Sequence, residues 1–144
     1  MRNSKEIGNL TELQCITRLY ELGYSVSVPF GNANKYDLII DVDDKLYKVQ
    51  VKHGLEHIDT LGEVDYIKIR CTWQSHNYYG YSIKRYSENE IDFFATFYDG
   101  ECYMIPIAEC STVKILHIKP PANGQRKGVS FIEDYKAQDI ISKL

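Results

Sequence analysis

The chain has 144 residues, of which 44% are hydrophobic and 26% are charged. That length suits a chain with its own hydrophobic core, and we expect a single domain over residues 1–144. No apolar run approaches the roughly 20 residues of a membrane span, and no secretory signal opens the sequence, so no membrane partner is expected. The formal net charge of −3 mildly disfavours a nucleic-acid partner, unless the charges are segregated on the surface.

Cysteine usage bears on the redox environment. Cys15, Cys71, Cys102 and Cys110 form no CxxC pair and show no spacing typical of a metal knuckle. Reduced, partly buried thiols in the cytosol are therefore favoured over disulfides.

The first predicted element is a helix near the start of the chain. Asn9 and Glu12 have the spacing of a capping box, with Asn9 as the N-cap, and an earlier start from Ser4 is an open alternative. The helix is expected to end near Leu22, with Gly23 as a left-handed stop. Glu12 also lies on the apolar stripe of the predicted helix. It is therefore either a cap or a functional acid on the buried side.

The stretch from Lys35 to Lys52 carries the strongest pattern. It predicts two strands joined by a tight turn at residues 42–44. The second strand alternates, which places Gln50 and Lys52 on one face. If the strands pair antiparallel, Asp37 faces the end of the second strand. An acid, a carboxamide and an amine then meet at one edge of a sheet, which packing alone does not require.

Further elements follow from periodicity. Apolar and polar residues alternate or cluster in five more predicted strands, at residues 24–28, 64–71, 91–98, 101–106 and 114–118. Asp99-Gly100 is a strong two-residue turn signal between two of these strands. Residues 53–62 are expected to form a loop or turn, and a closing helix is expected from about residue 130 onward.

Residues 72–90 are the least regular part of the chain and are expected to form a loop. Aromatic and cationic residues are interleaved there: Trp73, His76, Tyr78, Tyr79, Tyr81, Lys84, Arg85 and Tyr86. Lys and Arg neutralise phosphates, and tyrosines bond to phosphates or pack on sugars. Two interpretations are equally open: contact with nucleic acid, or a surface loop whose aromatic residues pack on the sheet.

Taken together, the residues Glu12, Asp37 and Gln50-Val51-Lys52 form a pattern that resembles the PD-(D/E)XK nuclease superfamily, in the variant where Gln replaces the second acid. The layout is most similar to the small PD-(D/E)XK homing endonucleases encoded in group I introns. The likeness extends to the later segments Glu90–Ala95, Tyr103–Pro106 and Glu133–Tyr135. Two departures stand out: Tyr36 precedes the acid where Pro is usual, and Gln50 removes one charge from the expected metal site.

The resemblance implies an α/β (α+β), restriction-endonuclease-like fold. A mixed β-sheet core is expected to be flanked by helices, with an added hairpin and loop region. It also implies that the carbonyl of Val51 is a further metal ligand beside the side chains of the motif.

The expected chemistry is hydrolysis of a phosphodiester, which needs a nucleophilic water and charge balance in the transition state. Asp37 is the expected anchor for Mg²⁺, with Mn²⁺ as an alternative, because Mg²⁺ prefers carboxylate oxygens. Gln50 can ligate through its carbonyl oxygen or hold a metal-bound water, and Glu12 is expected to bind a metal-coordinated water or a second ion. Lys52 can orient the attacking water, offset phosphate charge, or act as the base if its pKa is lowered.

The sequence therefore predicts a metal-dependent endonuclease acting on double-stranded DNA, as a site-specific homing endonuclease. One active site per chain cannot cut two strands, so a homo-oligomer, either a dimer or a tetramer, is expected. The expected location is the cytoplasm, or an organelle or nucleoid, on DNA. DNA contacts are predicted at six basic residues: Lys68, Arg70, Lys84, Arg85, Arg126 and Lys127.

Two alternatives stay open. A nuclease resembling Holliday-junction resolvases would share the core and the metal chemistry but recognise branched DNA. A catalytically silent DNA-binding domain of the same fold is permitted by Gln50, because the amide lacks the charge of the usual acid.

Overall fold

A computed structural model describes residues 1–144 of the chain. The helices are α1 (Ser4–Glu21), the short 3-10 turns η1 (Ile107–Glu109) and η2 (Ile132–Tyr135), and α2 (Ala137–Ile141). The strands are β1 (Ser25–Ser27), β2 (Leu38–Val42), β3 (Lys45–Val51), β4 (Leu55–Ile58), β5 (Val64–Arg70), β6 (Thr72–Asn77), β7 (Gly80–Arg85), β8 (Phe93–Tyr98), β9 (Glu101–Pro106) and β10 (Val113–His117). None of the helices is both long enough and apolar enough to span a lipid bilayer.

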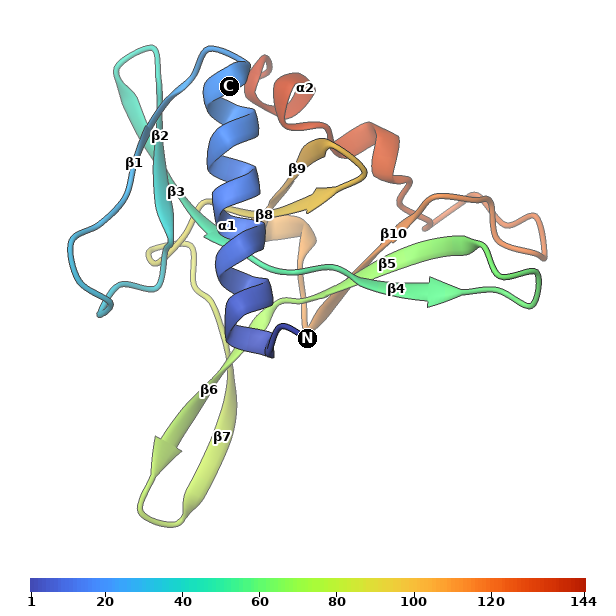
Figure 1. Cartoon of the computed structure of the whole chain (residues 1–144), viewed down its shortest axis with the longest axis horizontal. Coiled ribbons are helices and arrows are strands. Elements are labelled where there is room, and N and C mark those ends of the chain that lie inside the picture. Colours follow the sequence, from blue (N-terminus) through green and yellow to red (C-terminus); the bar gives the residue numbers. More distant parts are fainter.

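The central feature is a five-stranded mixed sheet with the order β1-β2-β3-β8-β9. All neighbours are antiparallel except β3 and β8, which run parallel. The long α1 lies across this sheet (Figure 1). Helix residues Cys15 and Leu19 pack with sheet residues such as Leu38 and Val49, and all four are fully buried. The predicted mixed sheet with flanking helices is confirmed.

The opposite face of the sheet packs on a second layer. A three-stranded sheet with the order β10-β5-β4 supplies Ile67 and Leu116, both fully buried. Strand β8 contributes to both clusters, because successive side chains point to opposite faces. Phe93 belongs to the first cluster and Phe94 to the second. The predicted strand over 91–98 is therefore a buried central strand, as its apolar run indicates.

Two tight turns agree with the predictions. Asp43 and Asp44 have φ values of 51° and 67°, so the turn between β2 and β3 is a two-residue turn of the kind that matches strand twist. Asp99 and Gly100 connect β8 to β9 with φ values of 48° and 80°. Both hairpins are thus fixed by their turn residues.

The start of α1 differs from the predicted capping box. The helix begins at Ser4, and the side chain of Asn3 is the cap, accepting a hydrogen bond of 2.9 Å from a backbone N–H of the first turn. Asn9 is therefore inside the helix, and Glu12 is a mid-helix residue with no capping role. The predicted end is confirmed, since Gly23 has a φ of 95° directly after the helix cap.

Two segments predicted as loops form strands instead. Residues 53–62 include β4, which pairs antiparallel with β5 and is exposed along its length, so no burial alternation marks it. Residues 72–90 include the β6–β7 hairpin. At its tip the Asn77 side chain accepts the Tyr79 N–H at 2.9 Å, and Gly80 has a φ of 128°. Polar composition concealed the hairpin from a periodicity argument.

The predicted closing helix is interrupted. Turn η2 is followed by Lys136 in an extended conformation (φ −56°, ψ 132°), and only then does α2 begin. Lys136 forms an isolated β-bridge with Tyr103 of β9, which accounts for the break.

Candidate active site

The hydrogen bonds of Asp37 fix its carboxylate beside the end of β3. Asp37 immediately precedes β2, and its N–H donates to the Val49 carbonyl at 2.8 Å. Its Oδ2 accepts the Val51 N–H at 2.8 Å. Only the second bond involves the carboxylate, and it uses one oxygen and leaves the other for a ligand.

Gln50 projects from the face of β3 opposite its buried residues. Val49 and Val51 are 0% and 8% exposed, whereas Gln50 and Lys52 are half-buried, so the predicted alternation is confirmed. The Gln50 Nε2 lies 3.5 Å from the Val51 carbonyl oxygen. A 180° rotation of the amide exchanges its nitrogen and oxygen, which brings two carbonyl oxygens next to each other at the end of β3.

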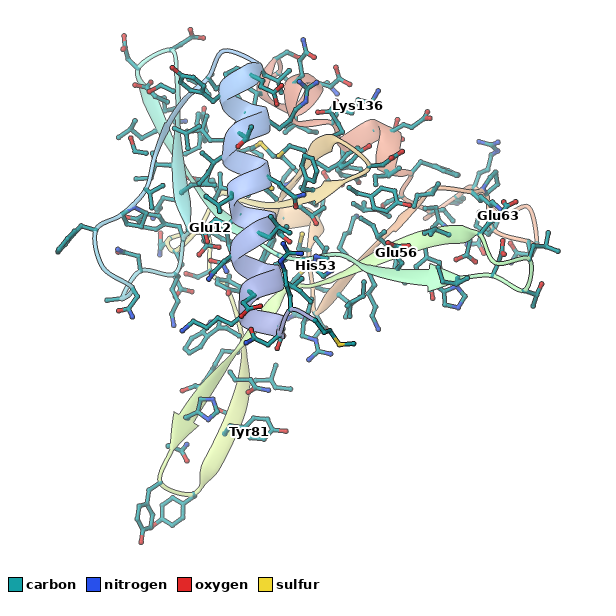
Figure 2. All side chains as sticks on the ribbon, in the orientation of Figure 1. Glu12, His53, Glu56, Glu63, Tyr81 and Lys136 are labelled. Carbon is teal, nitrogen blue, oxygen red and sulfur yellow. The ribbon has the colours of Figure 1, made fainter.

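Helix α1 brings Glu12 to the same place. Glu12 and Asp37 line one cleft of about 210 Å³, whose wall is completed by Tyr36 and the 28–34 segment. Figure 2 shows Glu12 on the side of α1 that faces β2 and β3. The cleft is thus formed by α1 and by the segment from Val28 to Asp37, which lie apart in the sequence.

The electrostatics of this cleft favour a cation. Burial raises the pKa of the Glu12 carboxyl, and the negative charge of Asp37 raises it further. Burial also raises the pKa of Asp37, against the opposing effects of the Val51 N–H and the charge of Lys52. Two carboxylates held together at this position repel each other, and a divalent cation between them would relieve that repulsion.

The donor set fits a hard cation. No three His, Cys, Asp or Glu side chains cluster anywhere in the chain. At the position of a third acid this site has the Gln50 side chain, and the backbone carbonyl of Val51 adds another oxygen. Carboxylates, amide carbonyls and backbone carbonyls are the oxygen ligands that Mg²⁺ and Mn²⁺ accept.

Lys52 is held apart from the carboxylates. Its Nζ donates to the Thr72 carbonyl at 3.0 Å and lies 5.2 Å from the centre of the Tyr86 ring. Burial lowers the pKa of Lys52, while the charge of Asp37 acts in the opposite direction. No ion pair includes Lys52. The amine is therefore positioned by β6 and is easier to deprotonate than an ordinary surface lysine.

The identity of the chain follows from this pattern and one comparison. The sequence profile of the PD-(D/E)XK endonuclease family matches residues 2–138. The chain belongs to this family. The bacterial homing endonuclease I-Ssp6803I has a similar fold, with a TM-score of 0.77 and 21% sequence identity over 99% of this chain and 95% of that chain. No curated protein sequence matches significantly.

This PD-(D/E)XK endonuclease brings its four predicted catalytic residues to one region. Asp37, Gln50 and Lys52 lie at the ends of β2 and β3, and Glu12 lies across the cleft from Asp37. The restriction-endonuclease-like fold predicted from the motif is confirmed. The role of each residue in catalysis stays a prediction.

The six predicted DNA contacts do not form one surface. Lys68 and Arg70 share the outer face of the three-stranded sheet, where Lys68 is paired with Leu55. Lys84 and Arg85 lie at the end of β7, directly opposite the first residues of β6. Arg126 and Lys127 lie on the loop between β10 and η2, at the right-hand end of the molecule and away from the β6–β7 hairpin (Figure 1).

Sequence reasoning did not predict three contacts at the base of the β6–β7 hairpin, although it named Trp73 and Tyr86 as candidate nucleic-acid contacts. Lys35 stacks on Trp73, with Nζ 3.3 Å from the ring centre. Thr72 supplies the carbonyl that accepts from Lys52. Burial, with a smaller effect of the Asp37 charge, raises the pKa of Tyr86 to about 12, so its hydroxyl stays neutral. All three contacts depend on how β6 and β7 meet the central sheet, which no local pattern reveals.

Proposed function

We propose that this family member is a divalent-metal-dependent, site-specific endodeoxyribonuclease of the homing type, acting on double-stranded DNA. One observation carries the proposal: Glu12 and Asp37 line one cleft, beside the strand end that presents Gln50 and Lys52. Family membership supports nuclease activity and a DNA substrate. The fold shared with a bacterial homing endonuclease supports the homing assignment only as an analogy.

The proposed cation is Mg²⁺, with Mn²⁺ as a substitute. The carboxylates of Glu12 and Asp37, the Gln50 side-chain oxygen and the Val51 carbonyl would hold it. When bound, such a cation supplies Lewis-acid stabilisation of the phosphate and activation of the attacking water. Gln50 contributes an oxygen without charge, so we expect weaker cation binding than a third carboxylate would give.

Lys52 is the proposed base or water-orienting residue. A lysine can accept a proton at Nζ only when it is deprotonated, and burial favours its neutral form. The hydrogen bond from Nζ to the Thr72 carbonyl holds the amine in place. It leaves the other hydrogen-bonding positions of Nζ for water or phosphate. Asp37 is the proposed anchor, because its hydrogen bond to Val51 holds it at the end of β3.

We propose that the enzyme works as a homo-oligomer, either a dimer or a tetramer, since one site per chain cannot cut both strands. The outer face of the three-stranded sheet supports this. Leu55, Val113 and Ile115 are 54%, 39% and 38% exposed there. Exposed apolar groups on one sheet face are suited to contact between copies.

The test is incubation of the purified protein with a library of supercoiled plasmids that carry randomised duplex inserts, because the target sequence is unknown. In Mg²⁺ or Mn²⁺ we expect nicked and linear DNA, and no product with a chelator. Lys45→Ala, on the same strand but at an exposed position, is a matched control and should cleave normally. Absence of cleavage in every divalent metal would overturn the proposal and favour the silent DNA-binding domain that Gln50 permits.

Two further observations refine the assignment of function. Faster cleavage of a four-way junction than of linear duplex would favour the resolvase alternative. Homing also requires that the gene interrupts a host gene, so the DNA around it should show a split reading frame. If the surrounding DNA contains no split host gene, the homing assignment fails and the nuclease assignment remains.

A further inference from the structure

The β6–β7 hairpin extends away from the body of the protein (Figure 1). Every residue of β7 is exposed, and Thr72 is the only buried residue of β6. Tyr78 and Tyr79 at the tip are 95% and 94% exposed, and Ile83 is 60% exposed. An isolated two-stranded hairpin is marginally stable in water, and uncovered apolar side chains on such a feature indicate a contact surface.

The base of the hairpin is tied to the candidate active site. Thr72, the first residue of β6, accepts the Lys52 Nζ hydrogen bond at 3.0 Å. Tyr86, which directly follows β7, packs edge-on against Phe94 with ring centres 5.3 Å apart. Strand β6 therefore begins, and β7 ends, beside the proposed catalytic lysine, whose Nζ also lies 5.2 Å from the centre of the Tyr86 ring, so the hairpin is placed relative to the candidate active site.

The strand register gives the hairpin two different faces, because residues directly opposite each other share a face. One face, here named the serine face, consists of Trp73, Ser75, Asn77, Ser82 and Lys84. The other, named the tyrosine face, consists of Gln74, His76, Tyr81, Ile83 and Arg85. The serine face has small hydroxyl groups at its middle, where Ser75 is paired with Ser82.

The serine face is on the side of the catalytic carboxylate. Lys35, two positions before Asp37, places its Nζ 3.3 Å from the centre of the Trp73 ring. Trp73 lies at the base of the serine face, so this face is continuous with the entrance to the cleft. Figure 2 shows Tyr81 projecting from the other side of the hairpin, away from the loop that carries Lys35. The serine face is therefore the face of the hairpin that lies next to the segment carrying Asp37.

Resting on the proposed nuclease function, we infer that the serine face lies in the major groove of the target DNA and determines sequence specificity through Ser75 and Ser82. The major groove accommodates a two-stranded β-ribbon, and serine hydroxyls both donate to and accept from base edges. Lys35 and Lys84, at the base of this face, are placed to neutralise the phosphates along the groove. The small side chains allow the backbone to approach the bases closely.

The length of the hairpin predicts which bases are contacted. Strand residues advance about 3.4 Å each, and successive bases of a DNA strand are about 3.4 Å apart. Ser75 is three positions along β6 from Thr72, so the Ser75–Ser82 pair should contact bases about three base pairs from the cut. The tip should reach about six base pairs from it.

The test compares two cross-strand pairs in one hairpin. Ser75→Ala with Ser82→Ala alters the serine face, and Gln74→Ala with Ile83→Ala alters the adjacent pair on the tyrosine face. Each variant and the unaltered protein cleave a randomised duplex library in Mg²⁺, and the products are sequenced. The same library is selected by binding in Ca²⁺, and melting temperatures and oligomeric state are recorded.

In the serine-face variant, we expect the preference for one base over the others to fall about tenfold at positions near three base pairs from the cut. Its melting temperature should stay unchanged, and the tyrosine-face variant should keep the full preference. Unchanged preference in the serine-face variant would overturn the inference, and so would equal loss in both variants. Loss of oligomers with intact preference would make this face an interface between copies instead.

The proposed function and this inference fail in different ways. If the unaltered protein cleaves nothing in any metal, the nuclease assignment fails. The Ca²⁺ selection still decides the inference in that case, because it reports base preference without cleavage. A shift of bound sequences in the serine-face variant alone supports it, and identical bound sequences overturn it.

Discussion

The β2–β3 and β6–β7 hairpins have the same local design and opposite surroundings. Each consists of two antiparallel strands joined by a two-residue turn. The first lies in the central sheet, and Leu38, Ile40 and Val49 are all fully buried. The second has no buried residue beyond Thr72, at its base. The two hairpins meet where Lys52 of the first segment donates to the carbonyl of Thr72.

This difference separates two tasks. Catalytic groups must be held within a fraction of an ångström, and buried strands with packed neighbours provide that precision. A surface that follows a DNA groove needs exposed side chains and tolerates a less stable support. We therefore expect changes in the first region to affect chemistry or folding, and changes in the second to affect recognition.

The largest effect is expected from Lys52→Ala. Loss of the amine should reduce cleavage by about 10²- to 10⁴-fold, the range for a residue that transfers or orients a proton. Binding of duplex DNA should stay measurable, because the hairpin residues and the carboxylates remain and only the bond to the Thr72 carbonyl is lost. Cleavage assays and gel-shift binding in Ca²⁺ check this, with Lys45→Ala as the control. Loss of binding together with cleavage in a folded variant would show that Lys52 is not primarily catalytic.

The contrast in burial predicts a large difference in stability. Phe94 is 1% exposed and packs between the sheets, so Phe94→Ala should lower the free energy of unfolding by about 3–5 kcal/mol. Ile83 is 60% exposed on the hairpin, and Ile83→Ala should change it by about 0.5 kcal/mol or less. Urea denaturation measures both. Similar losses would mean that the hairpin is part of the cooperative fold.

The pH dependence of cleavage tests the role of Lys52. Burial lowers the pKa of Lys52, and only the neutral amine can accept a proton. Cleavage should therefore increase about tenfold per pH unit below that pKa and level off above it. Lys52→Arg stays charged throughout and should lack this increase. The same slope in the Arg variant would assign the proton transfer to another group.

The smallest effect is expected from Gln50→Glu, which restores the acid that the motif usually carries. An added carboxylate should lower the Mg²⁺ concentration for half-maximal cleavage on the order of tenfold. It should also enlarge the increase in melting temperature that Mg²⁺ causes, because a ligand that binds only the folded state stabilises it. An unchanged Mg²⁺ requirement would place Gln50 outside the cation site.

Local chemistry explains why much of the site could be predicted. A period of two places Gln50 and Lys52 together, and the Asp43-Asp44 turn brings the start of β2 to the end of β3. Gly23 marks the helix end because it can adopt a positive φ. The family pattern then connects Glu12 to the same site across the fold.

The remaining features depend on distant contacts. Strand β4 is exposed along its length, so its sequence carries no alternation that distinguishes it from a loop. The β6–β7 hairpin has polar residues on both faces, and its turn is signalled only by Asn77 and Gly80. The break at Lys136 depends on pairing with Tyr103. The contact between Lys35 and Trp73 likewise needs the fold before it can form.

The most direct test of the central claim is a crystal structure of the protein with duplex DNA and Mn²⁺, in which anomalous scattering locates the metal. The account predicts a peak within about 2.3 Å of the Asp37 carboxylate and of at least one oxygen of Glu12, Gln50 or Val51, next to a phosphate. A peak only at other residues, or DNA bound with no metal in this cleft, would contradict it.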